Sequence, residues 1–225
     1  MNAALRGKLP YDPMRDVAPV AIVARTPLVL VVAQDAPWKN VDQLIAAARS
    51  KPTRIRYATF GAGSGPHLAG ELFALASGVK LQDVPYKGSA QATLAVMSGE
   101  IEMDIDTVAT VAPHIKAGKL RALGIVGAGR SSLLPDVKTL AEQKLSGATF
   151  DAWYGFAAPA KTPAPIVERL SRELTAVMAD PALQAQLRSQ GMEPVASGAT
   201  AFRAQMEGEI ARYRALAHRA GMALE

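Results

Sequence analysis

The first two thirds of the chain alternate between two spacings of apolar residues. Short runs rich in β-branched and aromatic residues, such as 55–60 and 81–86, predict strands. Between them, stretches such as 40–50 and 89–97 have apolar residues three and four positions apart, which predicts helices. Short strands that alternate with helices predict an α/β fold in which helices cover both faces of a parallel sheet.

Glycine, proline and helix-capping residues indicate where these elements begin and end. Strands are expected at 20–33, 55–60, 81–86, 100–106, 120–126 and 149–158, and helices at 40–50, 66–77, 89–97, 107–118 and 136–147. Asn40 and Gln43 have the spacing of a capping box. Gly78 and Gly99 are expected to close the helices before them.

The last third has a different pattern, with three amphipathic helices. They are expected from Pro163 to about Met178, from Pro181 with Asp180 as N-cap, and from about Thr200 to Ala220. Leu170, Leu174 and Met178 are spaced by four, as in an ordinary core stripe. The strands at 20–33 and 149–158 carry prolines and bracket the alternating region, which favours a hinge between two lobes over two central strands of one sheet.

Composition excludes several classes of chemistry. The 225 residues include no cysteine, which excludes disulfides, thiolate catalysis and Cys-based metal sites. The three histidines are not paired at helical spacing, so neither a zinc site nor another cofactor is expected. PLVLVVA (27–33) is too short for a membrane helix, and the opening MNAALRGKLPYDPMRD is too polar for an export signal. We therefore expect no direct membrane insertion and no signal peptide in this sequence.

The net charge of +5 is unevenly distributed. Residues 1–56 hold nine Lys and Arg against four Asp and Glu, without interleaved aromatic residues or a nucleic-acid-binding motif. This pattern is typical of a solvated basic edge, and no nucleic-acid partner is expected.

The glycine-rich loop GAGSGPH (61–67) joins a predicted strand to a predicted helix. Gly63, Ser64 and Gly65 can bring backbone N–H groups close to an anion, and the Ser64 hydroxyl and His67 ring can add donors. The spacing fits neither a dinucleotide fingerprint, nor a P-loop, nor a nucleophile elbow. A small anion such as a carboxylate therefore remains, together with two alternatives: a plain tight turn, and a purely structural His67.

Two further loops follow predicted strands. Lys87, Gly88 and Ser89 precede a helix, so this loop can add N–H groups and a cation, unless Ser89 is only an N-cap and Lys87 only a surface residue. Asp106 and Thr107 end another strand, where Asp106 either orients a ligand or caps a helix. Trp153 lies on the return strand, where it either lines a cleft or packs in a core.

Five segments together resemble the solute receptors of tripartite tricarboxylate transporters, the Bug-type periplasmic binding proteins. They occur in the family's order and span nearly the whole chain: LPYDPMRDVAPVAIVARTPLVLVV, GAGSGPHLAGELF, VPYKGSAQATLAVMSGEIEMDID, PHIKAGKLRALGI and WYGFAAPAKTPAPIVERLSRELTAVMADP.

The resemblance implies a two-lobed α/β fold of the type II periplasmic-binding-protein kind. It implies a periplasmic receptor, not an enzyme, that binds a small carboxylic acid such as a di- or tricarboxylate and delivers it to membrane transporter subunits. In such receptors the loop matching GAGSGPH opens a helix whose N-terminus faces the ligand carboxylate.

The sequence departs from the family pattern at its N-terminal side, where family members are longer. By this comparison, 1–27 is expected to be a remnant of the first lobe with the first crossing strand, and 28–150 a complete parallel-sheet lobe. Residues 151–225 would then form the return strand and the C-terminal helices of the first lobe. An incomplete cleft is expected to weaken or abolish binding and to leave apolar helix stripes exposed or paired with another chain.

Two other functions stay open at this point. One is a receptor-fold module that binds a protein partner through its C-terminal helices. The other is a hydrolase that uses Ser64, His67 and either Asp104 or Asp106, although Ser64 and His67 are close in sequence across a turn.

Overall fold

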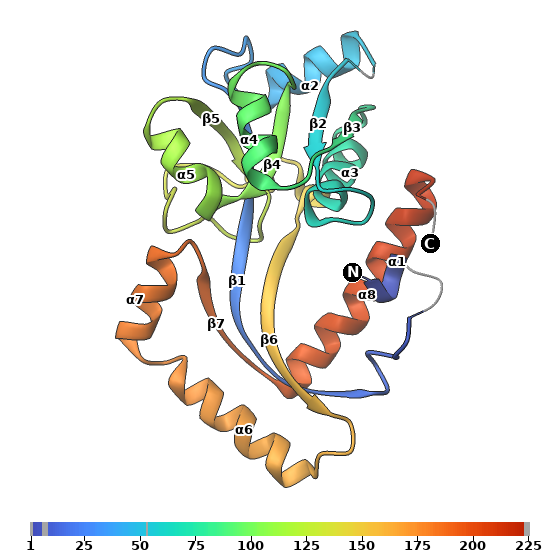
Figure 1. The fold of residues 1–225 in the computed structure, drawn as a ribbon, viewed down its shortest axis with the longest axis vertical. Helices are drawn as coiled ribbons and strands as arrows, with labels where there is room; N and C mark the ends of the chain where they lie inside the picture. Colours follow the sequence, from blue (N-terminus) through green and yellow to red (C-terminus); the bar gives the residue numbers. More distant parts are fainter. Residues whose placement is uncertain (1, 6–8, 53, 223–225) are drawn as a thin grey trace. The chain divides into compact units, whose positions relative to one another are not determined.

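The computed structural model describes residues 2–5, 9–52 and 54–222, shown in Figure 1. The chain forms two compact units: a terminal unit of Met1–Arg25 with Trp153–Glu225, and a central unit of Thr26–Ala152. Two strands contain the divisions between them, β1 (Val17–Ala33) and β6 (Asp151–Pro159). The assignment of 1–27, 28–150 and 151–225 to the lobes of a larger receptor stays a prediction.

The central unit is built on a mixed sheet. Its strand order is β3-β2-β4-β1-β5, where β2 is Arg56–Thr59, β3 Gln82–Pro85, β4 Met103–Thr107 and β5 Leu120–Ile125. β2 pairs in parallel with β3 and β4, as predicted. Within this order, β1 runs antiparallel to the adjacent β4 and β5. The parallel arrangement therefore holds for β2, β3 and β4, whereas the long β1, which α2 connects to β2, runs in the opposite direction.

Four helices belong to the central unit: α2 (Val41–Ser50), α3 (Gly65–Ser77), α4 (Ser89–Met97) and α5 (Val108–Lys116). The Gln43 N–H donates to Asn40 Oδ1 at 2.9 Å, which confirms the predicted cap of α2. The reciprocal bond differs from a standard capping box, because Gln43 Oε1 accepts from the Lys39 N–H at 2.6 Å. Gly78 has φ of 65° and closes α3 in the left-handed conformation.

The helices cover both faces of this sheet. On one face, α4 and α5 pack against an apolar cluster that includes Val29, Val31 and Ala58. On the other face, α3 packs on Tyr57, because Tyr57 and Ala58 are consecutive on β2 and point to opposite sides. A Cβ atom at Gly70 would lie 2.1 Å from the Tyr57 ring, so glycine permits this close approach.

The predicted helix at 136–147 is wrong. The segment consists of turns, followed by the 3₁₀ helix η1 (Ser146–Ala148). Its backbone bonds to the end of β5: Ile125 N–H donates to Lys138 O at 3.0 Å, and Leu140 N–H donates to Ile125 O at 2.8 Å. These groups are therefore not available for helical hydrogen bonds.

The terminal unit contains β7 (Glu193–Gly198), which pairs antiparallel with Ala21–Arg25 of β1. Its helices are α1 (Asn2–Leu5), α6 (Ala164–Val177), α7 (Pro181–Ser189) and α8 (Ala199–Ala220). Asp180 caps α7 as predicted, with Oδ1 accepting from the Ala182 N–H at 2.7 Å. The sequence did not predict α1 or β7.

Helix α6 has no buried residue. Ile166, Leu170 and Val177 are 50%, 43% and 54% exposed, so the predicted core stripe is wrong for Leu170, whereas Met178 is buried. The expectation that the C-terminal helices expose apolar residues is met on α6. Within the part of the chain that the structure describes, no helix is both long and apolar enough to cross a bilayer.

Candidate functional site

Three of the predicted loops lie at one edge of the central sheet. β3, β2 and β4 are adjacent and parallel, so their C-terminal ends meet at the same edge. Helices α3, α4 and α5 begin at or near this edge. The structure thus gathers the segments 61–67, 87–89 and 106–107 in the central unit, whereas Trp153 belongs to the terminal unit.

The glycine-rich loop is a tight turn closed around Ser64. Gly61 and Gly63 have φ of 96° and 73°, which glycine adopts without strain. The Ser64 N–H donates to Gly61 O at 3.2 Å, and the Ser64 Oγ accepts from the Phe60 N–H at 3.2 Å. The Ser64 hydroxyl therefore keeps its proton for an external acceptor.

His67 fixes the same loop from the first turn of α3. The Gly63 N–H donates to His67 Nδ1 at 3.0 Å, and the imidazole is buried, at 9% exposure. The Gly63 N–H is thus used inside the loop, and its role toward a ligand stays a prediction. Because Nδ1 accepts, the proton of the neutral imidazole resides on Nε2. The first-turn N–H groups of Gly65 and His67 have no intrahelical acceptor.

Ser89 and Thr107 both bond to Asp106. The N-cap of α4 is Gly88, so Ser89 is not the N-cap but the first helical residue. Its hydroxyl donates to Asp106 Oδ2. The Thr107 N–H donates to Asp106 Oδ1 at 2.6 Å, and Thr107, rather than Asp106, is the N-cap of α5. Two groups expected to face a ligand therefore hold the carboxylate of Asp106.

Lys87 is exposed beside this pair. Its N–H donates to Gln91 Oε1 at 3.3 Å, while its ammonium group makes no ion pair with any residue that the structure describes. A cation thus remains available next to the N-terminus of α4.

The acidic residues at the end of β4 are buried. Asp106 is 2% exposed, and burial raises its pKa although the bonds from Ser89 and Thr107 act in the opposite direction. Asp104 is fully buried, and both of its carboxyl oxygens lack a hydrogen-bond partner among the described residues. Burial, and then the neighbouring Asp106, raise the pKa of Asp104 well above its usual range.

The sequence offered a signal for this burial that was open to two interpretations. In 100–106, acidic residues alternate with Ile101, Met103 and Ile105, which is typical of a strand with one solvated face. Helices α4 and α5 cover the face that carries Asp104 and Asp106, so the acidic positions are inside.

The arrangement does not support the hydrolase alternative. The Ser64 Oγ accepts from Phe60, His67 Nδ1 accepts from Gly63, and Asp106 accepts from Ser89. In the described ranges, Ser64 and His67 share no hydrogen bond, so the relay that activates a serine nucleophile is not formed. Among the same residues, no three His, Asp or Glu side chains gather as a metal-binding group.

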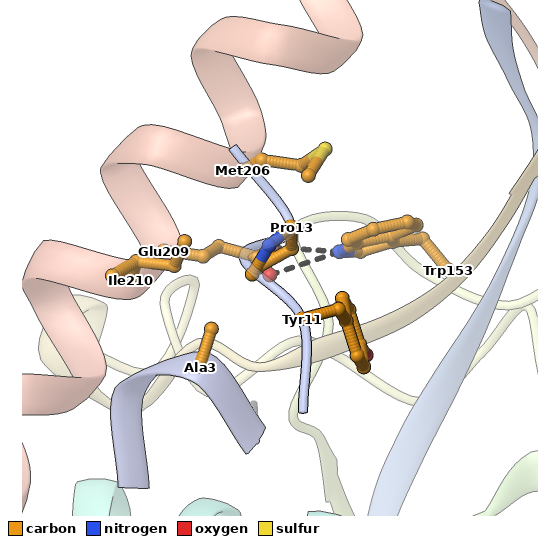
Figure 2. Close-up of a pocket in the computed structure, with 7 residues that line it drawn as sticks. All are labelled: Ala3, Tyr11, Pro13, Trp153, Met206, Glu209 and Ile210. Atoms are coloured by element: carbon orange, nitrogen blue, oxygen red, sulfur yellow. Dashed lines mark hydrogen bonds between the residues drawn. The ribbon is translucent and has the colours of Figure 1, made fainter. Parts of the chain in front are cut away.

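Trp153 makes its contacts inside the terminal unit. Figure 2 shows its indole N–H directed at Glu209, where it lies 2.9 Å from each carboxylate oxygen. Its ring meets Phe202 edge to face with centroids 5.1 Å apart. It lines a pocket of about 300 Å³ together with Tyr11 and Met206. These contacts support the packing alternative for Trp153, and its role toward a ligand stays a prediction.

Comparisons with known proteins extend over almost the whole chain. The model of the tripartite tricarboxylate transporter family receptor matches residues 3–222. Protein BugT of Bordetella pertussis is 32% identical over 100% of this chain and 69% of its own length. The UPF0065 protein from the tcbD-tcbE intergenic region of Pseudomonas sp. strain P51 is 35% identical over 93% of this chain. The match spans only 62% of that relative.

A solved structure agrees with these sequence matches. Rpa4515 of R. palustris, determined with adipate, superposes with a TM-score of 0.84 at 33% identity. The match covers 99% of this chain and 74% of that protein. The α/β fold is thus that of this group of binding proteins, and the chain belongs to the tripartite tricarboxylate transporter receptor family.

Proposed function

We propose that the protein binds a small dicarboxylic acid at the β3-β2-β4 edge of its central unit, without chemical turnover. The observation that carries this proposal is the presence of two helix N-termini, those of α3 and α4, at one sheet edge. Helix N-termini attract anions because their first N–H groups lack acceptors and carry the positive end of the helix dipole.

The donors at this edge suit a carboxylate. The Ser64 hydroxyl proton, the His67 Nε2 proton and the first-turn N–H groups of α3 are the proposed contacts for one carboxylate. The N-terminus of α4 and the Lys87 ammonium are the proposed contacts for a second. Each such contact contributes about 0.3–2 kcal/mol, whereas micromolar affinity needs about 8 kcal/mol, so several must act together.

Family membership and the adipate complex of Rpa4515 support this ligand class. They also support a receptor, rather than an enzyme, that acts in the periplasm and delivers its acid to the membrane subunits of a tripartite tricarboxylate transporter. The whole receptor's substrate and partners belong to this proposal, since the chain spans 62% of the relative from strain P51.

The test is a thermal melt with and without adipate, succinate, malate, citrate, glutamate or an aromatic acid at millimolar concentration. A ligand at a hundredfold excess over its Kd stabilises the folded protein by about 2.7 kcal/mol. We expect one class of acid to raise the melting temperature. The absence of a shift with every acid would contradict the proposal for this chain.

Two variants test whether the acid binds at the β3-β2-β4 edge. Lys87→Ala is expected to weaken binding several-fold without altering the unliganded melt, because Lys87 is exposed. Lys80→Ala is the matched control, since Lys80 is also exposed but precedes β3 at the opposite edge. Replacing both Ser64 and Ser89 by phenylalanine is expected to abolish binding. Unchanged affinity in the double variant would rule out this edge.

A second candidate function is association with another polypeptide through α6. It is favoured by the exposure of Ile166, Leu170 and Val177. Light scattering on the unliganded protein tests it: a larger species that dissociates in Leu170→Glu would support association, and a monomer at all concentrations would rule it out.

A further inference from the structure

A buried carboxyl without a partner lies in the middle of the apolar face covered by α4. Asp104 is paired with Val31 of β1 and with Ala58 of β2, so all three side chains point to the same face of the sheet. Val31 and Ala58 belong to the apolar cluster beneath α4 and α5. Asp104 is fully buried there, and neither of its oxygens has a hydrogen bond with the described residues.

Helix α4 places a hydroxyl opposite this carboxyl. α4 connects the parallel strands β3 and β4 and therefore runs antiparallel to β4. Ser89 bonds to Asp106, and Thr93 lies one turn further along α4, about 6 Å away. Asp104 lies two residues back along β4, about 6.6 Å away, which puts Thr93 opposite Asp104. Thr93 is 2% exposed, and its hydroxyl also lacks a partner in the described part of the chain.

Among the residues that the structure describes, no cationic side chain pairs with Asp104. Helix α4 carries no titratable side chain, and the buried face of α5 consists of Val108, Val111 and Ala112. Val31 of β1 and Ala58 of β2 are apolar. Arg56 lies on the same face of β2 as Ala58, but its guanidinium is paired with Glu102, with Nε 2.9 Å from Glu102 Oε2. The neighbouring titratable groups are Asp106 and Tyr86, and the Tyr86 hydroxyl donates to Glu100 at 3.0 Å. An ionised Asp104 would thus be a buried charge without a cationic partner, which is strongly unfavourable even though the adjacent Ile105 N–H favours the ionised form.

Asp106 has a different environment. Its two oxygens accept from the Ser89 hydroxyl and the Thr107 N–H, two bonds that favour the ionised form. The pair is therefore arranged to hold one proton on Asp104 and one negative charge on Asp106. That charge lies beside the N-terminus of α4, where the acid is proposed to bind. A second carboxylate nearby would raise the affinity of Asp106 for a proton.

We propose that Asp104 and Asp106 hold one proton in the free protein and take up a second from solvent when an acid binds. Binding then protonates the Asp106 carboxylate, so that the central unit captures its acid together with a proton. This inference rests on the proposed function, since it concerns the same sheet edge.

The first experiment tests, without any ligand, whether Asp104 holds a proton in the folded protein. A carboxyl that keeps its proton in the folded state but loses it on unfolding makes the protein less stable as pH rises from the unfolded pKa to the folded pKa. Asp104→Asn keeps the shape and removes the titration. The ratio of the wild-type to the variant unfolding constant should therefore increase by up to tenfold per pH unit above about pH 4. The control is Asp83→Asn on the exposed part of β3.

If the unfolding constants of wild type and Asp104→Asn have the same pH dependence, the inference that Asp104 holds a proton in the folded state is wrong. If Asp104→Asn fails to fold, Thr93→Val supplies the second measurement. It removes the hydroxyl and leaves the carboxyl, so its pH profile should keep the wild-type slope. A flat profile in Thr93→Val would equally contradict the inference.

The second experiment measures proton uptake on binding. Adipate is titrated calorimetrically into wild type and Asp106→Asn, in buffers of different ionisation enthalpy at about pH 6 and pH 7. The wild-type heat should depend on the buffer, by up to one proton per acid bound. The heat of Asp106→Asn should not, after the acid's own titration is subtracted. Buffer-independent wild-type heat overturns the inference but leaves the proposed function intact, whereas the absence of heat with any acid overturns both.

Discussion

Helices α3 and α6 share some sequence signals but have very different environments, and α3 (GPHLAGELFALAS) carries fewer charged residues than α6 (APIVERLSRELTAV). Both have a proline at their start and apolar residues at helical spacing. Nine residues of α3 are buried, whereas α6 has none. The comparison teaches that an amphipathic pattern predicts a helix and the face that would be buried, but not whether a partner covers that face.

The difference follows from what each helix packs against. α3 lies against β2 and η1, and Gly70 lets its backbone approach the Tyr57 ring. α6 contacts β7 and α8 within the terminal unit and keeps Ile166 and Val177 half exposed. Burial contributes roughly 25 cal/mol per Å² of apolar surface, so the tertiary stabilisation of α3 should far exceed that of α6.

The two tryptophans allow the units to be followed separately. Trp38 lies in the central unit and Trp153 in the terminal unit. Trp153→Phe leaves fluorescence that reports on the central unit, and Trp38→Phe leaves fluorescence that reports on the terminal unit. Urea unfolding of these two backgrounds provides the measurement for the following predictions.

The largest effect is expected from a matched pair of leucine truncations. Leu68 on α3 is fully buried and Leu170 on α6 is 43% exposed. Leu68→Ala should lower the free energy of unfolding of the central unit by about 2–5 kcal/mol, through lost burial and a cavity. Leu170→Ala should cost less than about 1 kcal/mol in the terminal unit. Equal losses would mean that another chain covers α6 in solution.

A pair of glycine substitutions should have effects of opposite sign. Gly70→Ala on α3 forces a methyl group into the Tyr57 ring and should destabilise the central unit by about 1–3 kcal/mol. Gly208 lies inside α8, and a Cβ atom there meets nothing within 4 Å. Gly208→Ala should therefore stabilise the terminal unit by about 0.5–1 kcal/mol. A stabilising Gly70→Ala would show that α3 and β2 are less closely packed than described.

Removal of the two helix caps should have a smaller effect. Asn40→Ala and Asp180→Ala each remove one side-chain bond to a first-turn N–H group, at the starts of α2 and α7. Asn40→Ala should cost about 1 kcal/mol in the urea unfolding of the central unit. Asp180→Ala should act mainly locally, because α7 has no buried residue, and should increase amide hydrogen exchange in α7. A large decrease in the free energy of unfolding of the terminal unit in Asp180→Ala would contradict the expected local effect.

The smallest effect concerns two exposed ion pairs at low pH. Arg130 lies 2.7 Å from Glu142, and the pKa of Glu142 falls to about 2, first because of the Arg130 hydrogen bonds and then because of the Thr139 N–H. Since this folded pKa is below the unfolded value, the contribution is present above about pH 4.5 and is lost as pH falls toward 2.

Glu142→Gln should remove that part of the pH dependence from the urea midpoint of the central unit. Glu173→Gln on α6 is the matched variant, because the Arg169–Glu173 distance is 3.9 Å. It should leave the midpoint of the terminal unit nearly unchanged. If the urea midpoints of wild type and Glu142→Gln change in parallel with pH, the lowered pKa of Glu142 does not contribute to the stability of the central unit.

Much of the fold could be predicted from local signals. The cap at Asn40, the left-handed Gly78 and the cap at Asp180 each act within a few residues, and the structure has all three. The helix expected at 136–147 failed because its backbone bonds to Ile125, more than ten residues away in sequence. β7 was missed because its short run includes Pro194 and Gly198, which are typical of a loop.

The sequence placed the three candidate loops after predicted strands, and the structure has them at one edge of the sheet because the ends of parallel strands meet there. Their role as a binding site stays a prediction. The bond between Gly63 and His67 and the bond between Ser89 and Asp106 changed which donors are available. Such bonds depend on side-chain directions that sequence spacing leaves open.

By itself, the sequence determined most of the alternation of strands and helices, the helix ends at Asn40, Gly78 and Asp180, and the family, because these depend on local spacing and on motifs in order. Only the tertiary structure decided that β1 runs antiparallel between β4 and β5, that α6 stays exposed, and that Asp104 is buried without a partner. The physical reason is that strand direction and burial depend on neighbours distant in the chain. The same alternation of acidic and apolar residues in 100–106 fits a solvated face or a covered one, and only the packing of α4 and α5 selects between them.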